Sequence, residues 1–277
     1  MYDLNDKFEI TAHLRESFIE AGHCVVRGLA SAEEIAHYKP AIDEATMQRR
    51  WDKRPLQERD TYGKAFIQSA AICQHNETTQ AFIYARRFAR VAAQLMGCQG
   101  VRLYHDQSLY KEPGGGFTPW HQDQPYYDVE GFQNVSFWIP VDPVLVEDSL
   151  ELIAGSHLGP WLMPRSFLDQ QAQWFPEGSL VEMPNFEKER ESHRILQWAM
   201  QPGDVIAFHM LTVHGAPGVS STNSRRVFSL RVLGDDMVYS PRDWVTSPDM
   251  SVMFAGQEER VSGQPLRGEW FPQLWPR

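Results

Sequence analysis

The sequence predicts an α+β fold that is mainly β, with helices in the first third of the chain and strands in the remainder. Apolar residues recur at helical spacing up to about residue 97, and the alternating or continuous apolar runs typical of strands follow. The chain of 277 residues is 42% hydrophobic and 12% aromatic, which is enough for one substantial core. We therefore expect a single domain over residues 1–277.

Three helices and one short strand are expected before residue 100. An amphipathic pattern covers residues 8–21 and ends at Gly22, and residues 24–29 form a short apolar strand. Ser31 and Glu34 have the spacing of a capping box, which predicts a helix from there to about residue 50. A third helix is expected over 79–97, ending near Gly97.

Six strands are expected after the helices, at 101–111, 118–124, 134–142, 150–153, 204–209 and 226–234. They predict a double-stranded β-helix, a cupin-like jelly-roll barrel of two sheets, with the N-terminal helices packed outside. The main irregular segment, 158–200, is rich in aromatic and acidic residues. It predicts a lid-like insertion or, alternatively, padding on the barrel exterior.

Two imidazoles and one carboxylate form the most informative motif: His121 and Asp123, with one residue between them, and His214 on a distant strand. This is the ligand set of sites that hold ferrous iron and leave coordination positions open. On a regular strand, His121 and Asp123 point to the same side, and a strand folding back alongside supplies His214. The same alternation places His209 on the other face, and we expect His105 and His157 to be structural.

Arg225 follows His214 by eleven residues and precedes the alternating run 226–234. A planar, permanently charged guanidinium can bind a carboxylate through two hydrogen bonds. A metal-binding histidine with an arginine about one hairpin away suits a keto acid that chelates the metal at one end and carries a carboxylate at the other. Arg226 faces the opposite side and is the local competitor for this role.

Five stretches of the chain carry a resemblance to a known family. They are 104–114, 118–127 with its Trp-His-Gln-Asp, 136–144, 152–157 with its Gly-Ser-His, and 201–209 with its Gln-Pro-Gly-Asp. Their order, continuing to His214 and Arg225, resembles that of the phytanoyl-CoA dioxygenase family, which includes ectoine hydroxylase. The resemblance covers most of the chain. It implies Fe(II), 2-oxoglutarate as cosubstrate, and O2. The implied reaction hydroxylates, or otherwise oxidises a C–H bond of, a small-molecule metabolite and releases succinate and CO2.

Carried over by position, the resemblance implies roles for individual residues. His121, Asp123 and His214 would be the catalytic iron ligands, and Arg225 would pair with the distal carboxylate of 2-oxoglutarate. Further cosubstrate contacts are expected from Gln122, Trp138, Ser108 and Tyr110, the last two pointing into the barrel with Asp106. Candidates for the substrate wall are Trp120, Tyr126 and Tyr127, and those for an N-terminal cosubstrate contact are Lys64 and Gln68.

Two positions distinguish the chain within this resemblance. Relatives that halogenate have a small residue where Asp123 stands, so its carboxylate favours hydroxylation. Some members have a serine that contacts the cosubstrate where this chain has Ala216, so one cosubstrate hydrogen bond is expected to be missing.

Composition restricts the partners and the location of the protein. A net charge of −10 and a pI near 5.5 argue against nucleic acid and against an anionic membrane surface. The acidic insertion and the absence of a basic patch favour a neutral or cationic small-molecule substrate. The sequence shows no membrane-spanning run, no signal pattern and three widely spaced cysteines, which together predict a cytoplasmic protein.

Two alternatives remain open at the level of sequence. A cupin-like metal-dependent isomerase or hydrolase would use the three ligands without requiring Arg225 or 2-oxoglutarate. A binding module that has lost catalysis would keep the fold, although such loss typically removes a metal ligand, and here all three are present.

Overall fold

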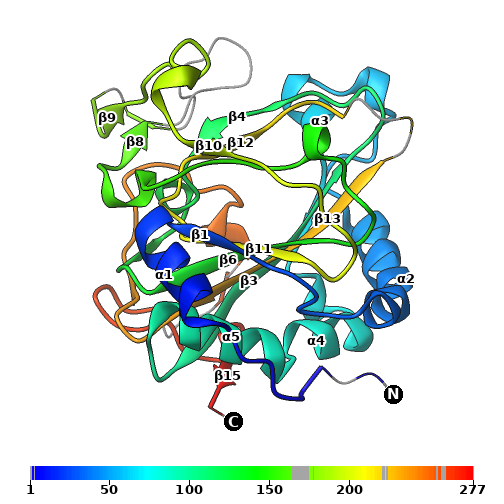
Figure 1. Cartoon of the computed structure of the whole chain (residues 1–277), viewed down its shortest axis with the longest axis vertical. Helices are drawn as coiled ribbons and strands as arrows, with labels where there is room; N and C mark the ends of the chain where they lie inside the picture. The colour runs from blue at the N-terminus through cyan, green and yellow to red at the C-terminus, as the bar shows by residue number, and fades with distance from the viewer. Residues whose placement is uncertain are drawn as a thin grey trace.

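Two antiparallel sheets enclose the cavity of the protein, and helices cover the outer face of the larger sheet (Figure 1). The computed structural model describes residues 2, 4–163, 175–176, 178–219, 222, 224–253, 255–256 and 260–276. The arrangement confirms the predicted double-stranded β-helix with the N-terminal helices outside it.

The larger sheet has the strand order β1-β11-β6-β13-β3-β15, and β2 also pairs with β3. These strands are β1 (His23–Val26), β2 (Ile67–Ala70), β3 (Val101–Lys111), β6 (Asn134–Pro140), β11 (Val205–Phe208), β13 (Arg225–Leu233) and β15 (Gln273–Trp275). Residues 67–70 and 273–275 were not predicted as strands, since each is too short to show a period.

The smaller sheet has the order β10-β7-β12-β4. Its strands are β4 (Thr118–His121), β7 (Glu151–Ile153), β10 (Ile195–Leu196) and β12 (His214–Ala216). Two further pairs lie outside the sheets: β5 (Val129–Glu130) with β14 (Val238–Tyr239), and β8 (Leu162–Met163) with β9 (Val181–Glu182). The insertion 158–200 thus contributes β8, β9 and β10, while its residues 164–174 and 177 lie outside the described residues.

The helices are α1 (Ala12–Ala21), α2 (Ala32–Arg49), α3 (Thr61–Ala65), α4 (Glu77–Ile83), α5 (Arg86–Met96) and α6 (Met250–Met253). The capping box of α2 forms as predicted, because Ser31 accepts from Glu34 N and the Glu34 carboxylate accepts from Ser31 N. None of the helices in the described part of the chain is long and apolar enough to cross a membrane.

The predicted helix over 79–97 is wrong in one respect, because the structure divides it into α4 and α5. Ala85 is extended, and the amide of Arg86 is capped by the side chain of Asn5 at 3.0 Å. The break allows Arg87 to reach inward, where its guanidinium binds the carboxylate of Glu34. A helical period cannot reveal such a break when apolar residues continue across it.

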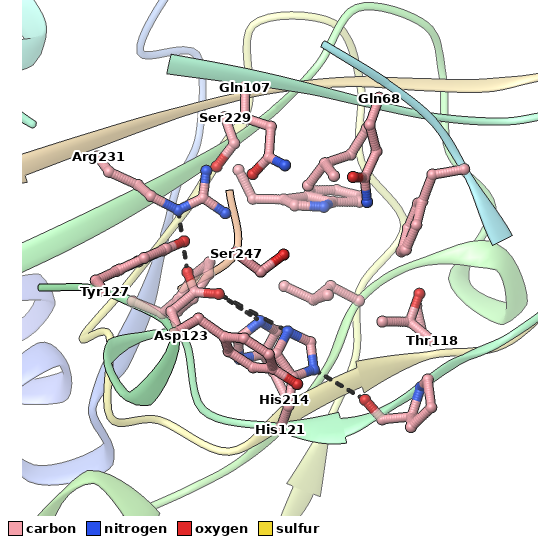
Figure 2. A pocket seen from close by; sticks show the side chains of 18 of the residues that line it. Gln68, Gln107, Thr118, His121, Asp123, Tyr127, His214, Ser229, Arg231 and Ser247 are labelled. Carbon is pink, nitrogen blue, oxygen red and sulfur yellow. Dashed lines mark hydrogen bonds and ion pairs between the residues drawn. The ribbon is translucent and has the colours of Figure 1, made fainter. Parts of the chain in front are cut away.

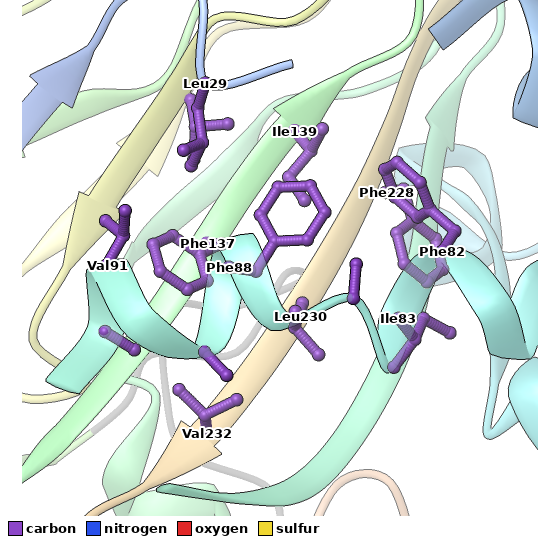
Figure 3. Packing of buried hydrophobic residues seen from close by; sticks show 14 of the residues in the cluster. Leu29, Phe82, Ile83, Phe88, Val91, Phe137, Ile139, Phe228, Leu230 and Val232 are labelled. Carbon is purple, nitrogen blue, oxygen red and sulfur yellow. The ribbon is translucent and has the colours of Figure 1, made fainter. Parts of the chain in front are cut away.

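The main core lies between the helices and the larger sheet (Figure 3). Phe88 of α5 packs there with Phe137 of β6, and their ring centroids are 6.1 Å apart. Truncating such a buried ring to alanine costs about 3–5 kcal/mol. On β13, Phe228 and Leu230 face this core, so the alternate residues of the strand point toward the smaller sheet.

Candidate metal centre and cosubstrate cavity

The three predicted ligands converge at one point between the sheets. Oδ1 of Asp123 lies 3.7 Å from His121 Nε2 and 3.7 Å from His214 Nε2. The three candidate ligand atoms lie within 4.8 Å of one another, which is the separation expected around a single ion. Figure 2 shows the two imidazoles side by side with the Asp123 carboxylate directed at them. The residues therefore fit a two-histidine, one-carboxylate metal site.

Main-chain contacts fix the orientation of both imidazoles. His121 and His214 are paired across β4 and β12. Nδ1 of His121 lies 2.8 Å from Pro119 O, and Nδ1 of His214 lies 2.9 Å from Thr212 O. A carbonyl only accepts, so each Nδ1 carries the proton and donates. Each Nε2 is thereby left with a lone pair for a metal.

The turn that carries Asp123 differs from the prediction. The strand expected over 118–124 ends at His121, and Asp123 has helical backbone angles at the start of a 3-10 turn. The strand-alternation argument for Asp123 was therefore wrong, although the carboxylate still meets the histidines. Its position is set by Met210, whose carbonyl accepts from Asp123 N at 2.8 Å and from Gln124 N at 3.0 Å.

Electrostatics keep all three ligands in the form that binds a metal. Burial lowers the pKa of the His214 imidazole to about 3, and the neighbouring His121 adds to the effect. Burial also lowers the pKa of His121. Burial would raise the pKa of Asp123, but the charge of the nearby Arg231 holds it well below its ordinary value. The site is thus two neutral imidazoles and one carboxylate.

Arg225 is buried at one end of the same cavity. Its guanidinium donates to Asp148 O at 2.6 Å and lies 5.6 Å from the centroid of the Trp138 ring. Its Nε has no hydrogen-bond partner among the described residues. Burial lowers the pKa of Arg225 to about 10, so the group stays protonated near neutral pH. Arg226, the competing candidate, instead binds Asp43 and Asp142 outside the cavity.

The cavity between the sheets has a volume of about 100 Å³. Of the predicted residues, the metal ligands, Arg225, Trp138, Tyr126, Tyr127 and Gln68 line it, whereas Lys64 is exposed elsewhere. The lining residues that the sequence analysis did not assign include Phe66, Gln107, Thr118, Ser229, Arg231 and Ser247.

The expectation that Ser108 and Tyr110 point into the barrel is wrong, because β3 has the opposite phase. The Ser108 hydroxyl lies 2.6 Å from Thr46 Oγ1, and the Tyr110 hydroxyl donates to Asp43 at 2.7 Å, both on α2. Asp106 likewise turns away and caps Ile72–Gln74. The residues of β3 that line the cavity are Gln107 and Leu109.

Gln122 and Trp120 are also absent from the cavity lining. The Gln122 side-chain amide is used by the main chain, since it donates to Leu211 O at 2.9 Å and accepts from Leu162 N at 2.8 Å. Trp120 lies in a neighbouring groove, where its Nε1 donates to Glu187 at 2.7 Å. Neither side chain is brought to the metal ligands in the way the sequence analysis expected.

Arg231 is the residue near the candidate ligands that the sequence analysis missed most clearly. It lines the cavity, and its Nε lies 3.3 Å from Asp123 Oδ2. The sequence does contain a pattern that predicts this position. Arg231 is six residues after Arg225 on one strand, so the two side chains share a face.

The C-terminal segment supplies part of the cavity wall. Trp244 Nε1 donates to Pro125 O at 2.8 Å, and Ser247 N donates to Tyr126 O at 3.1 Å. Figure 2 shows Ser247 projecting into the cavity near the metal ligands. Phe175 of the insertion lies between Tyr126 and Trp244, with ring centroids 5.5 Å and 5.2 Å away. The rim of the cavity therefore joins the insertion to the C-terminal segment.

The remaining histidines stand apart from the metal ligands. Nε2 of His209 donates to Phe132 O at 2.7 Å, and Nδ1 accepts from Leu211 N at 3.0 Å. His157 contacts Ile19 O at 3.1 Å. His105 is buried beside Tyr127, with its ring centroid 5.1 Å from that ring. None of the three belongs to the described ligand cluster.

Comparison with curated proteins gives one relative of modest identity. A phytanoyl-CoA dioxygenase of Arabidopsis thaliana is 26% identical over 172 residues, which are 61% of this chain. The match spans 57% of the length of that relative.

Solved structures share the fold at low identity. The epimerase SnoN, in complex with Fe3+, alpha ketoglutarate and nogalamycin RO, has a TM-score of 0.73 and 21% identity, covering 95% of this chain and 97% of that one. The carbocyclase SnoK from nogalamycin biosynthesis has a TM-score of 0.71 and 20% identity, covering 95% and 96%. EctD from S. alaskensis, with 2-oxoglutarate and 5-hydroxyectoine, has a TM-score of 0.64 and 18% identity, covering 97% and 93%.

The family assignment rests on the breadth of the sequence match. The model of the phytanoyl-CoA dioxygenase (PhyH) family matches residues 18–227, most of the chain and all the residues from the first larger-sheet strand to Arg225. With the ligand geometry and the fold in agreement, the chain belongs to the phytanoyl-CoA dioxygenase family.

Proposed function

We propose that the protein is a non-haem Fe(II)- and 2-oxoglutarate-dependent dioxygenase that hydroxylates, or otherwise oxidises a C–H bond of, a small-molecule metabolite and releases succinate and CO2. The observation that carries the proposal is the placement of two neutral imidazoles, one carboxylate and the buried Arg225 around one cavity. A metal-dependent isomerase or hydrolase has no need of a buried guanidinium facing the same cavity. The match to the family model over residues 18–227 also supports the proposal.

The residues divide the work between the two ends of the cavity. His121, Asp123 and His214 would hold the iron on one face and leave positions open for the keto acid and O2. The bound iron supplies the oxidising chemistry. Arg225, with Trp138 against its guanidinium, would bind the distal carboxylate of the cosubstrate. This fixes the cosubstrate at both ends.

The size of the cavity indicates where the substrate would lie. Pockets that enclose a drug-sized ligand usually measure roughly 300–1,000 Å³, whereas this cavity measures about 100 Å³. The cosubstrate would take most of that space. The reacting carbon would then enter from the rim, where Tyr126, Tyr127 and Ser247 line the cavity, and the insertion 158–200 would act as a lid.

The charges around the cavity support a neutral or cationic substrate. Arg231 is engaged by Asp123, and Arg225 is reserved for the cosubstrate. An anionic substrate would therefore lack an uncommitted guanidinium among the described lining residues. The cysteines Cys24, Cys73 and Cys98 are free, which is compatible with the reducing cytoplasm that we propose as its location.

The decisive test is an anaerobic titration of 2-oxoglutarate into the Fe(II)-loaded protein, followed by the visible metal-to-ligand charge-transfer band. The proposal expects the band in the wild type and in Arg226→Gln, whose side chain lies outside the cavity. It expects the band to be lost in His214→Ala and to need a much higher 2-oxoglutarate concentration in Arg225→Gln. Tight Fe(II) binding without a band would instead support the isomerase or hydrolase.

A further inference from the structure

We infer that Arg242 is a positioning residue that docks the C-terminal segment on the rim and thereby holds Ser247 in the cavity. The inference goes beyond the proposed function and rests on it only for a kinetic test. It assigns a task to a residue outside the described lining of the cavity. Three observations carry it: the irregular course of residues 240–249, the contacts of one guanidinium, and the fixed surface that this guanidinium meets.

The first observation is that residues 240–249 reach the cavity without any helix or strand. Ser247 lines the cavity and projects toward the metal ligands (Figure 2). No ladder of paired strands holds this segment, so its position depends on individual contacts. A residue that makes several of these contacts at once would therefore set the place of Ser247.

The second observation is that the side chain of Arg242 makes such contacts and is only 8% exposed. Its Nε donates to Tyr127 O at 2.9 Å, and its Nη2 donates to Val129 O at 2.5 Å. Both carbonyls belong to the segment that follows the turn at Asp123. A planar guanidinium can donate in two directions at once and still present its faces to aromatic rings.

Two tryptophan rings lie beside the same guanidinium. Its Cζ is 4.7 Å from the centroid of the Trp161 ring and 5.9 Å from that of the Trp244 ring. Both distances are within the roughly 6 Å over which a cation and an aromatic ring attract each other. Arg242 thus connects three segments that are far apart in sequence: residues 127–129, the start of the insertion, and the C-terminal segment.

The third observation is that Trp161 is held in place independently of Arg242. The side-chain amide of Gln122 donates to Pro160 O at 3.2 Å and accepts from Leu162 N at 2.8 Å, so both main-chain neighbours of Trp161 are fixed. Gln122 lies between two metal ligands in the sequence. The start of the insertion is therefore a fixed surface, and Arg242 docks the C-terminal segment on it.

The charge of Arg242 does not explain this docking. Its described ion pair is with Glu130, at 3.6 Å, and that carboxylate is 61% exposed, so the attraction is weak. Burial lowers the pKa of Arg242, which shows that the guanidinium is partly withdrawn from water. A lysine would keep the charge but could not donate to both carbonyls and stack on the rings in one geometry.

The first test is hydrogen exchange in the metal-free protein. Arg242→Met keeps an unbranched side chain but removes the guanidinium, and the amides of residues 240–249 are expected to exchange about ten-fold faster. Arg90→Met is the matched control, since it removes a guanidinium 5.0 Å from the Trp275 ring, where α5 meets β15. It should leave exchange in 240–249 unchanged. Wild-type exchange there in Arg242→Met would overturn the inference.

The second test measures how fast 2-oxoglutarate enters and leaves the Fe(II)-loaded protein, by anaerobic stopped-flow of the charge-transfer band. Arg242→Met is expected to raise the association and dissociation rate constants several-fold together, because the rim is loosened while the binding contacts stay. The dissociation constants for Fe(II) and 2-oxoglutarate should keep their wild-type values. A change in either constant would place the effect of Arg242 at the ligands and overturn the inference.

Arg242→Lys separates geometry from charge and is expected to resemble Arg242→Met in both tests. Wild-type behaviour of Arg242→Lys would show that charge alone suffices and would contradict the docking described above. If Arg242→Met does not fold, Trp161→Leu removes the ring on the other side of the contact and serves for the same comparisons.

The two tests keep this inference separate from the proposed function. A wild type that does not bind 2-oxoglutarate would end the proposed function, yet the hydrogen-exchange comparison needs neither metal nor cosubstrate and would still decide the role of Arg242. A wild type that binds 2-oxoglutarate, with unchanged exchange of 240–249 in Arg242→Met, would overturn the role of Arg242 alone.

Discussion

The carboxylate of Asp123 is held on one side by Arg231, whose Nε lies 3.3 Å from Oδ2. Ser136 Oγ donates to the same oxygen at 2.9 Å. Oδ1 is left facing the Nε2 atoms of His121 and His214. The ion pair therefore presents Asp123 to a metal through one oxygen.

Loss of this ion pair should weaken metal binding. Arg231→Gln is expected to raise the dissociation constant for Fe(II) about 10- to 100-fold, because partners that orient a ligand contribute on this scale. Ser136→Ala removes one hydrogen bond to the carboxylate but keeps the ion pair with Arg231, and should have a smaller effect. Competition with a chromophoric chelator under anaerobic conditions measures both constants. Wild-type affinity in Arg231→Gln would show that the ion pair does not position the ligand.

Two adjacent residues can test which face of β3 points into the cavity. Gln107 lines the cavity, whereas the Ser108 hydroxyl contacts Thr46 on α2. Gln107→Leu is expected to raise KM for 2-oxoglutarate or for the substrate several-fold. Ser108→Ala should leave both KM values unchanged and lower the free energy of unfolding by about 1 kcal/mol. Steady-state kinetics and urea unfolding distinguish the two, and the reverse pattern would contradict the observed phase.

Gln122 is expected to act on stability. Its side chain donates to Pro160 O and Leu211 O and accepts from Leu162 N. Gln122→Leu leaves these buried main-chain groups unpaired, and each unpaired group lowers the free energy of unfolding by about 1–3 kcal/mol. We expect the free energy of unfolding of the metal-free protein to fall by about 3 kcal/mol or more. Gln122→Glu, which keeps the acceptor for Leu162, should lose less. A variant of wild-type stability with weakened 2-oxoglutarate binding would instead support a direct cosubstrate contact.

Acid should destabilise the protein partly through His209. Burial lowers the pKa of His209 from 6.5 to about 3, and its Nδ1 already accepts from Leu211 N. Between these two pH values the unfolded chain binds a proton that the folded chain does not, so stability is lost as the pH falls from 6.5 toward 3. Each such group contributes at most about 1.4 kcal/mol per pH unit.

The measurement is the free energy of unfolding of the metal-free protein from pH 7 to pH 4. His209→Gln should show a flatter fall than the wild type over this range, whatever its stability at pH 7. Parallel curves would indicate that His209 does not contribute to the acid sensitivity. The comparison at each pH removes the contribution of other buried histidines, such as His23, whose pKa burial lowers to about 4.

The meeting of His121, Asp123, His214 and Arg225 at one cavity was predictable from sequence, because the chemistry and the order of these residues are specific. The phase of β3 was not, since both of its faces are buried, one against helices and one against the cavity. Polar residues therefore occur on both faces, with Asp106 and Ser108 on one and Gln107 on the other, and the usual contrast between a buried and an exposed face is missing.

The turn at Asp123 and the position of Ser247 could not be predicted from the sequence, for other reasons. His121 and Asp123 share the spacing of a strand, but a main-chain carbonyl, that of Met210, sets the turn. Ser247 lies in an irregular segment with no period, and only the tertiary fold brings it to the cavity.

The C-terminal segment is attached to the turn after Asp123 through main-chain oxygens. Pro125 O and Tyr126 O receive the donors from Trp244 and Ser247. Every residue type offers a carbonyl, so these attachments place no demand on which side chains follow the candidate metal ligand Asp123. During evolution the C-terminal segment can be exchanged or rebuilt while the ligand set stays intact. The fold can thus adapt to new substrates without a change in the residues that carry its oxidation chemistry.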